Sequence, residues 1–256
     1  MVRAKIDPLW NNVSAFSRMG IYAINEAEKY AMNPVEIAVQ LFVVLFAITV
    51  HEAAHGWAAA RMGDTTARDM GRVTLNPLAH IDPIGTVLLP LVLVLIGAPA
   101  FGWAKPVPVN LYRLRNPRRD NLLISAAGPL SNIAAGTAAL VLLLILKAAS
   151  PAVRLFLQSP DLARALMPKG FYPAQGLALI LFFAVFINFY FAVFNLIPIP
   201  PLDGSGIVMG LLNEKAAARY DRIRPYGFFI LIALLSFNVL DVITLPIQVL
   251  ISLLLR

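Results

Sequence analysis

The sequence predicts an all-α polytopic membrane protein with about four to six transmembrane helices and short extended or β re-entrant elements between them. Hydrophobic residues make up 59% of the 256 positions and charged residues only 14%, whereas a soluble domain is about 25% charged. Crossing a bilayer takes about 20 apolar residues in a helix, and several uncharged runs approach that length. These runs are 37–50, 84–98, 133–146, 177–194 and 228–240.

Residues 1–32 differ in character from everything that follows. They include Asn11, Arg18 and Glu26, which make the segment too polar for either a signal peptide or a membrane span. Its scattered apolar side chains fit an amphipathic helix lying in the membrane interface, with a disordered arm as the alternative. We therefore expect an N-terminal interfacial arm.

The rest of the chain is interpreted as one membrane domain, because no repeat, linker or low-complexity segment divides it. We expect a membrane core over 33–225 and a C-terminal part over 226–256, which forms one tilted span or two short ones. Extended pieces are expected at 72–75 and 106–110, where Pro106 and Pro108 forbid a helix. Their backbone must find partners within the protein or in a wet cavity, because lipid offers none.

The net charge of +7 raises the question of a nucleic-acid partner. The basic residues lie in loops between the apolar runs, where they favour membrane topology and contact with anionic lipid instead. We therefore expect the lipid bilayer as a partner and no nucleic acid. The chain has no cysteine, so disulfides are excluded and a transition-metal site must use histidines and carboxylates.

The first apolar run ends in His51-Glu52-Ala53-Ala54-His55. Two histidines four positions apart share one helix face, about 6 Å apart along the axis, so both imidazoles can reach one ion. Glu52 lies beside them in the arrangement of a zinc hydrolase base. The motif can arise by chance, but it contains two of only three histidines. It also places ionisable groups in a helix apolar enough to span the membrane, where inserting each charged side chain near the centre costs roughly 2.5–3.5 kcal/mol.

Two histidines leave a catalytic zinc one protein ligand short. His80 and Asp203 are the candidates. Asp203 follows Pro198, Pro200 and Pro201, which stop the preceding run, and it can equally be a turn or N-cap residue. His80 can be a ligand, an outer hydrogen-bond partner or a plain loop residue, and the pattern alone does not rank these roles.

Two further asparagines stand within apolar helices. Asn132 lies on one helix face with Gly128 and Gly136, and small residues at this spacing let another helix approach closely. Its amide can serve the active site or a substrate, or it can be one hydrogen-bonded residue in a packing face. Asn195 and Asn188 pose the same question on the run at 177–194 and just beyond it.

Three motifs in order resemble the site-2 protease family of intramembrane zinc metalloproteases, over most of residues 35–225. They are His51-Glu52-x-x-His55, Gly128-Pro129-x-x-Asn132 and the stretch from Asn195 to Gly204. The segments 71–77 and 102–110 also look like the small subgroup that lacks a PDZ or CBS domain.

The resemblance implies one Zn²⁺ per chain, held by His51, His55 and Asp203, with Glu52 as the catalytic base that activates the attacking water. It favours Asn195 as a substrate contact. We add Asn132 as a second substrate-binding candidate, and His80 as a possible outer partner. The implied substrate is a membrane protein with a transmembrane segment. The implied location is the cell (inner) membrane, with the active site toward the cytoplasm.

For Asp203 to meet His51 and His55, the chain must cross the membrane an even number of times between them. Three runs intervene, so one of them must fail to cross. The run 84–98 is short and contains Pro90, and we expect it to re-enter or to lie within protein.

Two rival functions remain at this level. A zinc-binding membrane protein without proteolytic activity, or a transporter, would need four ligands or ionisable residues along several spans. A catalytically silent scaffold would not need the full set of motif residues.

Overall fold

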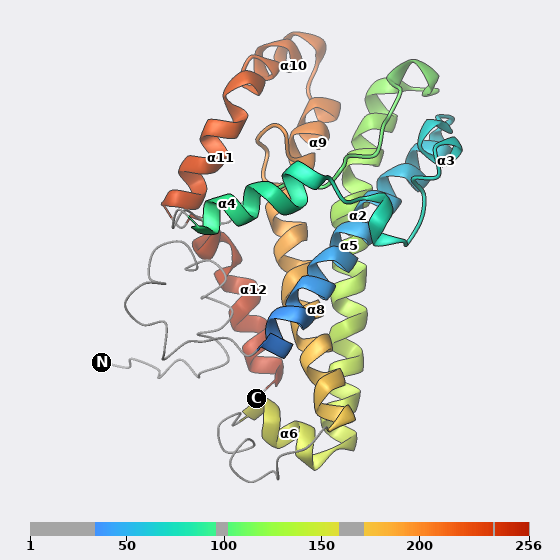
Figure 1. Ribbon diagram of the computed structural model, residues 1–256. Coiled ribbons are helices and arrows are strands. Elements are labelled where there is room, and N and C mark those ends of the chain that lie inside the picture. Colours follow the sequence, from blue (N-terminus) through green and yellow to red (C-terminus); the bar gives the residue numbers. More distant parts are fainter. Residues whose placement is uncertain (1–33, 96–101, 159–171, 238, 256) are drawn as a thin grey trace.

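The computed structural model describes residues 34–95, 102–158, 172–237 and 239–255 of the chain (Figure 1). The predicted interfacial arm at 1–32 lies outside these residues. The helices in chain order are α2 (Pro34–Met62), α3 (Thr66–Asp69), η1 (Pro77–Ala79), η2 (Pro83–Leu88), α4 (Leu89–Leu95), η3 (Leu111–Arg113), α5 (Pro117–Ala149), α6 (Pro151–Gln158), α8 (Pro173–Leu196), α9 (Asp203–Leu211), α10 (Glu214–Asp221), η4 (Arg224–Tyr226), α11 (Gly227–Ser236) and α12 (Val239–Leu255).

Helices α2, α5 and α8 form the centre of the molecule. Each is long and apolar enough to cross a membrane, with 26, 33 and 24 residues in the qualifying stretches. The pair from Glu214 to Leu255 passes the same test as one span bent by 62°. The described residues thus hold three to four candidate membrane spans, the architecture of an all-α polytopic membrane protein.

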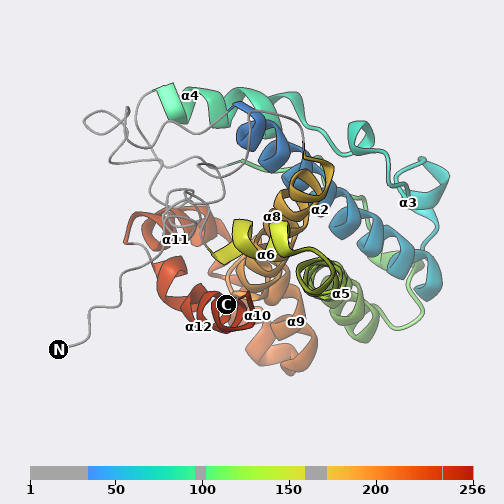
Figure 2. The ribbon, with the colours of Figure 1, turned by 90° about the horizontal axis from the view of Figure 1, so that it is seen from below.

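The core lies where α2, α5, α8 and α12 meet (Figure 2). Val43, Leu143, Phe182 and Ile251, one from each of these helices, are at most 3% exposed. The outer faces of the same helices carry exposed leucines and phenylalanines, as expected of surfaces that face hydrocarbon. Gly136 brings α5 and α8 close together, because a Cβ there would lie 3.2 Å from the Phe189 ring.

Helix α4 runs crosswise to the long helices rather than alongside them (Figures 1 and 2). With η2 it covers 83–95, and it is among the apolar helices too short for the spanning test. Positions 96–98 of the predicted run lie outside the described residues. Two long helices, α5 and α8, therefore separate His51 from Asp203, which is the even number that the topology argument requires.

The predicted β elements are not found in the described residues, which contain no strand. Residues 73–75 form bends, and residue 72 and segment 102–110 have no regular secondary structure. The physical reason is visible in the hydrogen bonds. Pro106 and Pro108 have no N–H to offer, and the N–H groups of Val107 and Asn110 donate to side-chain carboxylates instead of to another strand.

Candidate metal centre

The two motif histidines lie on α2, well inside the candidate span. His51 is 7% exposed, and its ring meets that of His55 edge-on with 4.6 Å between centroids. Their Nε2 atoms are 3.1 Å apart. The i, i+4 spacing along an α-helix produces this pairing without any help from the loops.

Asp203 reaches the same point from a different part of the chain, just after the turn that follows α8. It is the first residue of α9, and its Oδ2 lies 3.0 Å from His51 Nε2 and 3.3 Å from His55 Nε2. The turn before it is tightly packed. A Cβ on Gly204 would lie 2.3 Å from the Leu196 carbonyl oxygen, and a Cβ on Gly227 would lie 1.8 Å from that of Pro200. Glycine is therefore required at both positions for Asp203 to reach the histidines.

The proton positions on both rings follow from their other hydrogen bonds. His55 Nδ1 lies 2.7 Å from the backbone oxygen of Ile124, which can only accept, so Nδ1 carries the proton. His51 Nδ1 lies 2.7 Å from Oδ1 of Asn132 and donates to it for the same reason. Both Nε2 atoms are then left with lone pairs.

In this neutral tautomer three lone-pair atoms face one another. Nε2 of His51, Nε2 of His55 and a carboxylate oxygen of Asp203 all lie within 4.8 Å of one another. Oδ2 of Asp203 is buried and has no hydrogen-bond donor among the described residues. Such a cluster of acceptors is repulsive unless a cation lies at its centre.

The spacing of these atoms fits zinc. A tetrahedral site with bonds of about 2.0 Å has corners about 3.3 Å apart, and the three measured separations are 3.0, 3.1 and 3.3 Å. Two imidazoles and one carboxylate are also a usual protein ligand set for catalytic zinc. The residues present thus fit the metal.

Glu52 lies beside the three candidate ligands and is not part of the group that could hold a metal. Its Oε2 accepts a hydrogen bond from the Val107 N–H at 3.0 Å, which fixes the carboxylate toward segment 102–110. No second hydrogen bond to this carboxylate is present in the described part of the chain, so its other oxygen is available to a proton.

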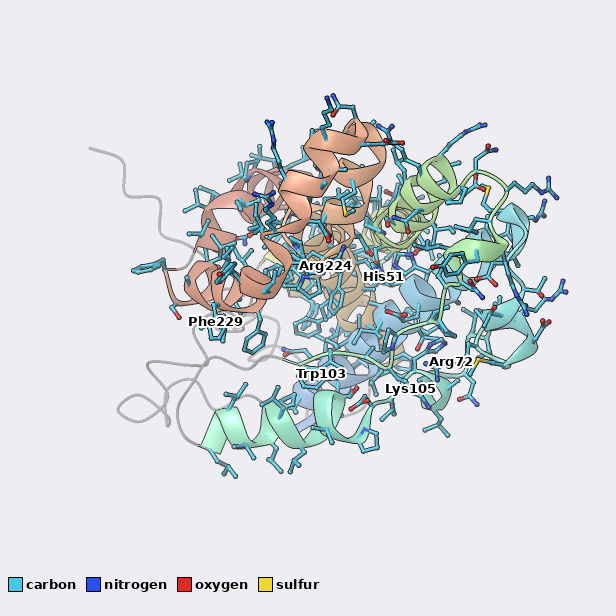
Figure 3. All side chains as sticks on the ribbon, turned by 90° about the horizontal axis from the view of Figure 1, so that it is seen from above. His51, Arg72, Trp103, Lys105, Arg224 and Phe229 are labelled. Atoms are coloured by element: carbon cyan, nitrogen blue, oxygen red, sulfur yellow. The ribbon has the colours of Figure 1, made fainter. Side chains whose placement is uncertain are left out.

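Segment 102–110 is held by hydrogen bonds along its length, and Figure 3 shows Trp103, Lys105 and Arg72 on the same side of the molecule. Trp103 N–H donates to the Gly85 oxygen and Lys105 N–H to the His80 oxygen. The guanidinium of buried Arg72 donates to the carbonyl oxygens of Lys105 and Pro106, and also to that of Ala79. Together these bonds hold Val107 where its N–H meets Glu52.

Asp64 anchors the far end of this segment. Its side chain is fully buried and accepts bonds from Thr66 and from the Asn110 N–H, the latter at 2.6 Å. Burial by itself would raise the pKa of Asp64, but the hydrogen bonds from Thr66 and Asn110, aided by the charge of Arg113, lower the pKa below its usual value. The carboxylate is therefore ionised at neutral pH.

The other predicted residues occupy three different environments. Asn132 is fully buried, and its amide bonds to His51, Asn188 and the Ala47 oxygen. Asn195 is partly exposed and donates one bond, to the Phe191 oxygen. His80 is buried away from the ligand group, with Nε2 donating to the Thr74 oxygen.

Two polar residues of this region were not assigned a role from the sequence. Arg72 follows Gly71 in a turn, and nothing in this local pattern indicates that its side chain is buried and donates to carbonyl oxygens. Asp64 directly follows Gly63 at the end of α2, which by itself predicts only a turn.

The chain is similar to known proteins over most of its length. Residues 39–237 match the model of peptidase family M50. The chain is 32% identical to "Putative zinc metalloprotease YwhC" of Bacillus subtilis, over 81% of this chain and 84% of that protein. It is 30% identical to "Putative zinc metalloprotease Rip2" of Mycolicibacterium smegmatis over 75% of this chain, a match that spans 64% of that protein, less than two thirds. No solved structure was found to match.

The matched region includes all three candidate ligand residues and both long helices between them. The donor set, its spacing and the relatives together indicate a zinc cofactor and a metalloprotease that is an integral membrane protein. This chain belongs to peptidase family M50, the site-2 protease family of zinc metalloproteases.

Proposed function

We propose that this protein hydrolyses peptide bonds in or near the transmembrane segments of other membrane proteins. The depth of the metal centre carries the proposal. His51 is the fifteenth residue of the 26-residue candidate span from Ile37, about 21 Å from its beginning and about 16 Å from its end. A ligand set this far inside a span meets peptide bonds that are themselves within the membrane.

His51, His55 and Asp203 would hold the zinc, which when bound polarises the scissile carbonyl and makes water a better nucleophile. Glu52 supplies the proton transfer. Its free oxygen takes a proton from the attacking water and returns it to the leaving nitrogen. The bond from Val107 N–H keeps that carboxylate oriented throughout.

A substrate helix must unwind before its carbonyl groups are accessible, and segment 102–110 offers it an edge. The N–H groups of 103, 105 and 107 all point inward to acceptors of the protein. In extended chain the alternate residues 104, 106 and 108 face the other way. Two of these are prolines without an N–H, and the Pro106 oxygen already accepts from Arg72, so this outer edge leaves the carbonyl oxygens of 104 and 108 for a substrate and almost no donors. We propose that an unwound substrate lies along it and donates its own N–H groups.

Asn195 is the amide that we propose as a further substrate contact, because it is partly exposed and has hydrogen-bonding capacity left. The loops on the zinc side, 61–82, 103–119 and 212–224, hold more Lys and Arg than the loops on the opposite side. This asymmetry supports an active site that faces the cytoplasm, with the protein in the cell (inner) membrane.

The test is cleavage of a single-span membrane substrate by the purified protein in detergent or vesicles. Glu52→Gln keeps the side-chain shape and removes the base, so we expect the cleavage rate to fall by about 10²–10⁴ while zinc remains bound. The matched control is Glu214→Gln, an exposed glutamate on α10 that touches none of the ligands. It should cleave like the wild type.

Treatment with a zinc chelator distinguishes the proposed protease from a protein that only binds or transports zinc. Zinc removal should abolish cleavage, and adding zinc back should restore it. If Glu52→Gln binds zinc and still cleaves at the wild-type rate, the base assignment is wrong. If the zinc-loaded wild type cleaves no substrate tested but moves zinc across a vesicle, the transporter alternative gains support instead.

A further inference from the structure

A chain of hydrogen bonds leads from the metal centre into the middle of the helix bundle. His51 on α2 donates to Asn132 on α5, at 2.7 Å. Asn132 Nδ2 donates to Oδ1 of Asn188 on α8, at 2.9 Å, and to the Ala47 oxygen, at 3.1 Å. Asn188 Nδ2 donates to the Ala184 oxygen, at 2.8 Å. Three helices are thus joined by one connected polar path.

The direction of every bond in this path is set by backbone carbonyls, which can only accept. The Ala184 oxygen requires the Asn188 amide nitrogen, so Oδ1 of Asn188 turns toward Asn132. The Ala47 oxygen and this Oδ1 both require the Asn132 amide nitrogen. Oδ1 of Asn132 must then face His51 and accept from Nδ1, which leaves the lone pair of His51 on Nε2, the atom that points to Asp203.

The path is closed to water. Asn132 is fully buried and Asn188 is 3% exposed. Gly136 makes the approach of α8 possible, since a Cβ there would lie 3.3 Å from that of Asn188. His55 uses a backbone oxygen for the same purpose, so His51 is the ligand that depends on side chains.

We propose that Asn132 and Asn188 are positioning residues that hold His51 in its zinc-binding tautomer, with Asn188 acting through Asn132 although it never touches the metal. The inference rests on the metal centre of the proposed function and adds residues to it. A general packing role for the two amides would be served by any pair of buried hydrogen-bonding groups. The fixed direction of the bonds is what links Asn188 to one particular nitrogen of His51.

The test is zinc affinity, measured on the purified full chain in detergent by competition with a chromophoric chelator. Asn132→Leu removes the hydrogen bond to His51, and Asn188→Leu removes the one to Asn132. Both substitutions keep much of the side-chain volume. Loss of an outer hydrogen-bond partner of a metal ligand weakens metal binding about 10–100-fold, and we expect this for Asn132→Leu, with a smaller loss for Asn188→Leu. The double variant should bind zinc no more weakly than Asn132→Leu alone, because the two residues act in series.

Two further variants separate positioning from damage to the fold. Val185→Ala on α8 also removes buried contacts close to Asn188 in the chain, and it should lower the unfolding midpoint with zinc affinity unchanged. Asn132→Asp keeps an acceptor for His51, and it should retain more of the zinc affinity than Asn132→Leu. This rescue remains informative if the Asn188 variant does not fold.

Unchanged zinc affinity in Asn188→Leu, or strictly additive losses in the double variant, would overturn the proposal. A wild type that binds no zinc would overturn the metal centre together with it. Because the readout is binding, a protein that holds zinc as expected but cleaves nothing would refute the proposed proteolysis and leave the positioning role standing.

Discussion

Gly128 touches both metal ligands, which makes it the most informative position for a single substitution. It lies on α5 against the imidazoles. A Cβ added there would lie 2.5 Å from His55 Nε2 and 2.6 Å from His51 Cε1. Ordinary contact begins near 3.4 Å, so Gly128→Ala requires a displacement of about 0.9 Å somewhere in the site.

Neither ring can move that far without loss. His51 is held by Asn132 and His55 by the Ile124 oxygen, and both partners belong to α5, the helix that carries Gly128. Metal–ligand distances tolerate changes of only about 0.2 Å. Overpacking of this kind costs about 1–3 kcal/mol, which corresponds to a zinc affinity weaker by about 5–150-fold.

The assay is chelator competition on the purified protein, with the unfolding midpoint recorded beside it. Alanine is about 1 kcal/mol better than glycine inside a helix, so the zinc-free variant should be no less helical than the wild type. Gly176→Ala on α8 is the matched control, since a Cβ there meets nothing within 4 Å. It should leave zinc affinity unchanged. A Gly128→Ala protein that binds zinc within twofold of the wild type would refute the steric reasoning.

Two other predictions follow from segment 102–110 and its anchors. Arg72→Gln leaves the carbonyl oxygens of Lys105 and Pro106 without their hydrogen-bond donor. The kcat of substrate cleavage should therefore fall at least about tenfold, while the zinc content stays unchanged. An equal kcat in the variant and the wild type would contradict this. The pKa of Asp64 is lower in the folded protein, so its stabilisation is present above its unfolded pKa of about 3.9 and is lost as the pH falls below that value. Thermal unfolding of zinc-free protein between pH 5 and 3 should therefore show a smaller midpoint loss for Asp64→Asn than for the wild type, and parallel curves would exclude this role.

Much of the metal centre could be predicted from local pattern. His51 and His55 are four residues apart on one helix, and helix geometry alone brings their rings together. Asp203 was one of two candidates until the resemblance favoured it. The structure places it 3.0 Å from His51 Nε2 and leaves His80 buried elsewhere. The choice between the two depended on how α8 and α9 pack, which no local pattern records.

The hydrogen-bond partners of the buried asparagines could not be predicted from the sequence pattern. Asn132 was a candidate for serving the active site or a substrate, or for a hydrogen-bonded packing face, and the structure gives its amide three partners inside the protein. Asn188 was noticed but had no assigned role. Which partner a buried amide finds depends on the helices on either side of it, since hydrogen bonds are decided over tenths of an ångström.

The predicted β elements are absent from the described residues for a related reason. Extended chain at 106–110 is dictated by its prolines, but a strand needs a partner. The N–H groups of Val107 and Asn110 found the carboxylates of Glu52 and Asp64 instead, residues about 50 positions earlier in the chain.

The third candidate ligand, and with it the even number of crossings, came from the resemblance to the family, whereas the amino-acid sequence by itself predicted that this protein lies in a membrane and that α2 carries two candidate metal ligands with a candidate base between them. These properties depend on composition and on the period of the helix, which are local. The tertiary structure alone showed which carboxylate lies beside the two histidines, which N–H donates to Glu52 and which amide oxygen faces His51. Those contacts join residues dozens of positions apart, and their energies depend on distances that only the packed bundle sets.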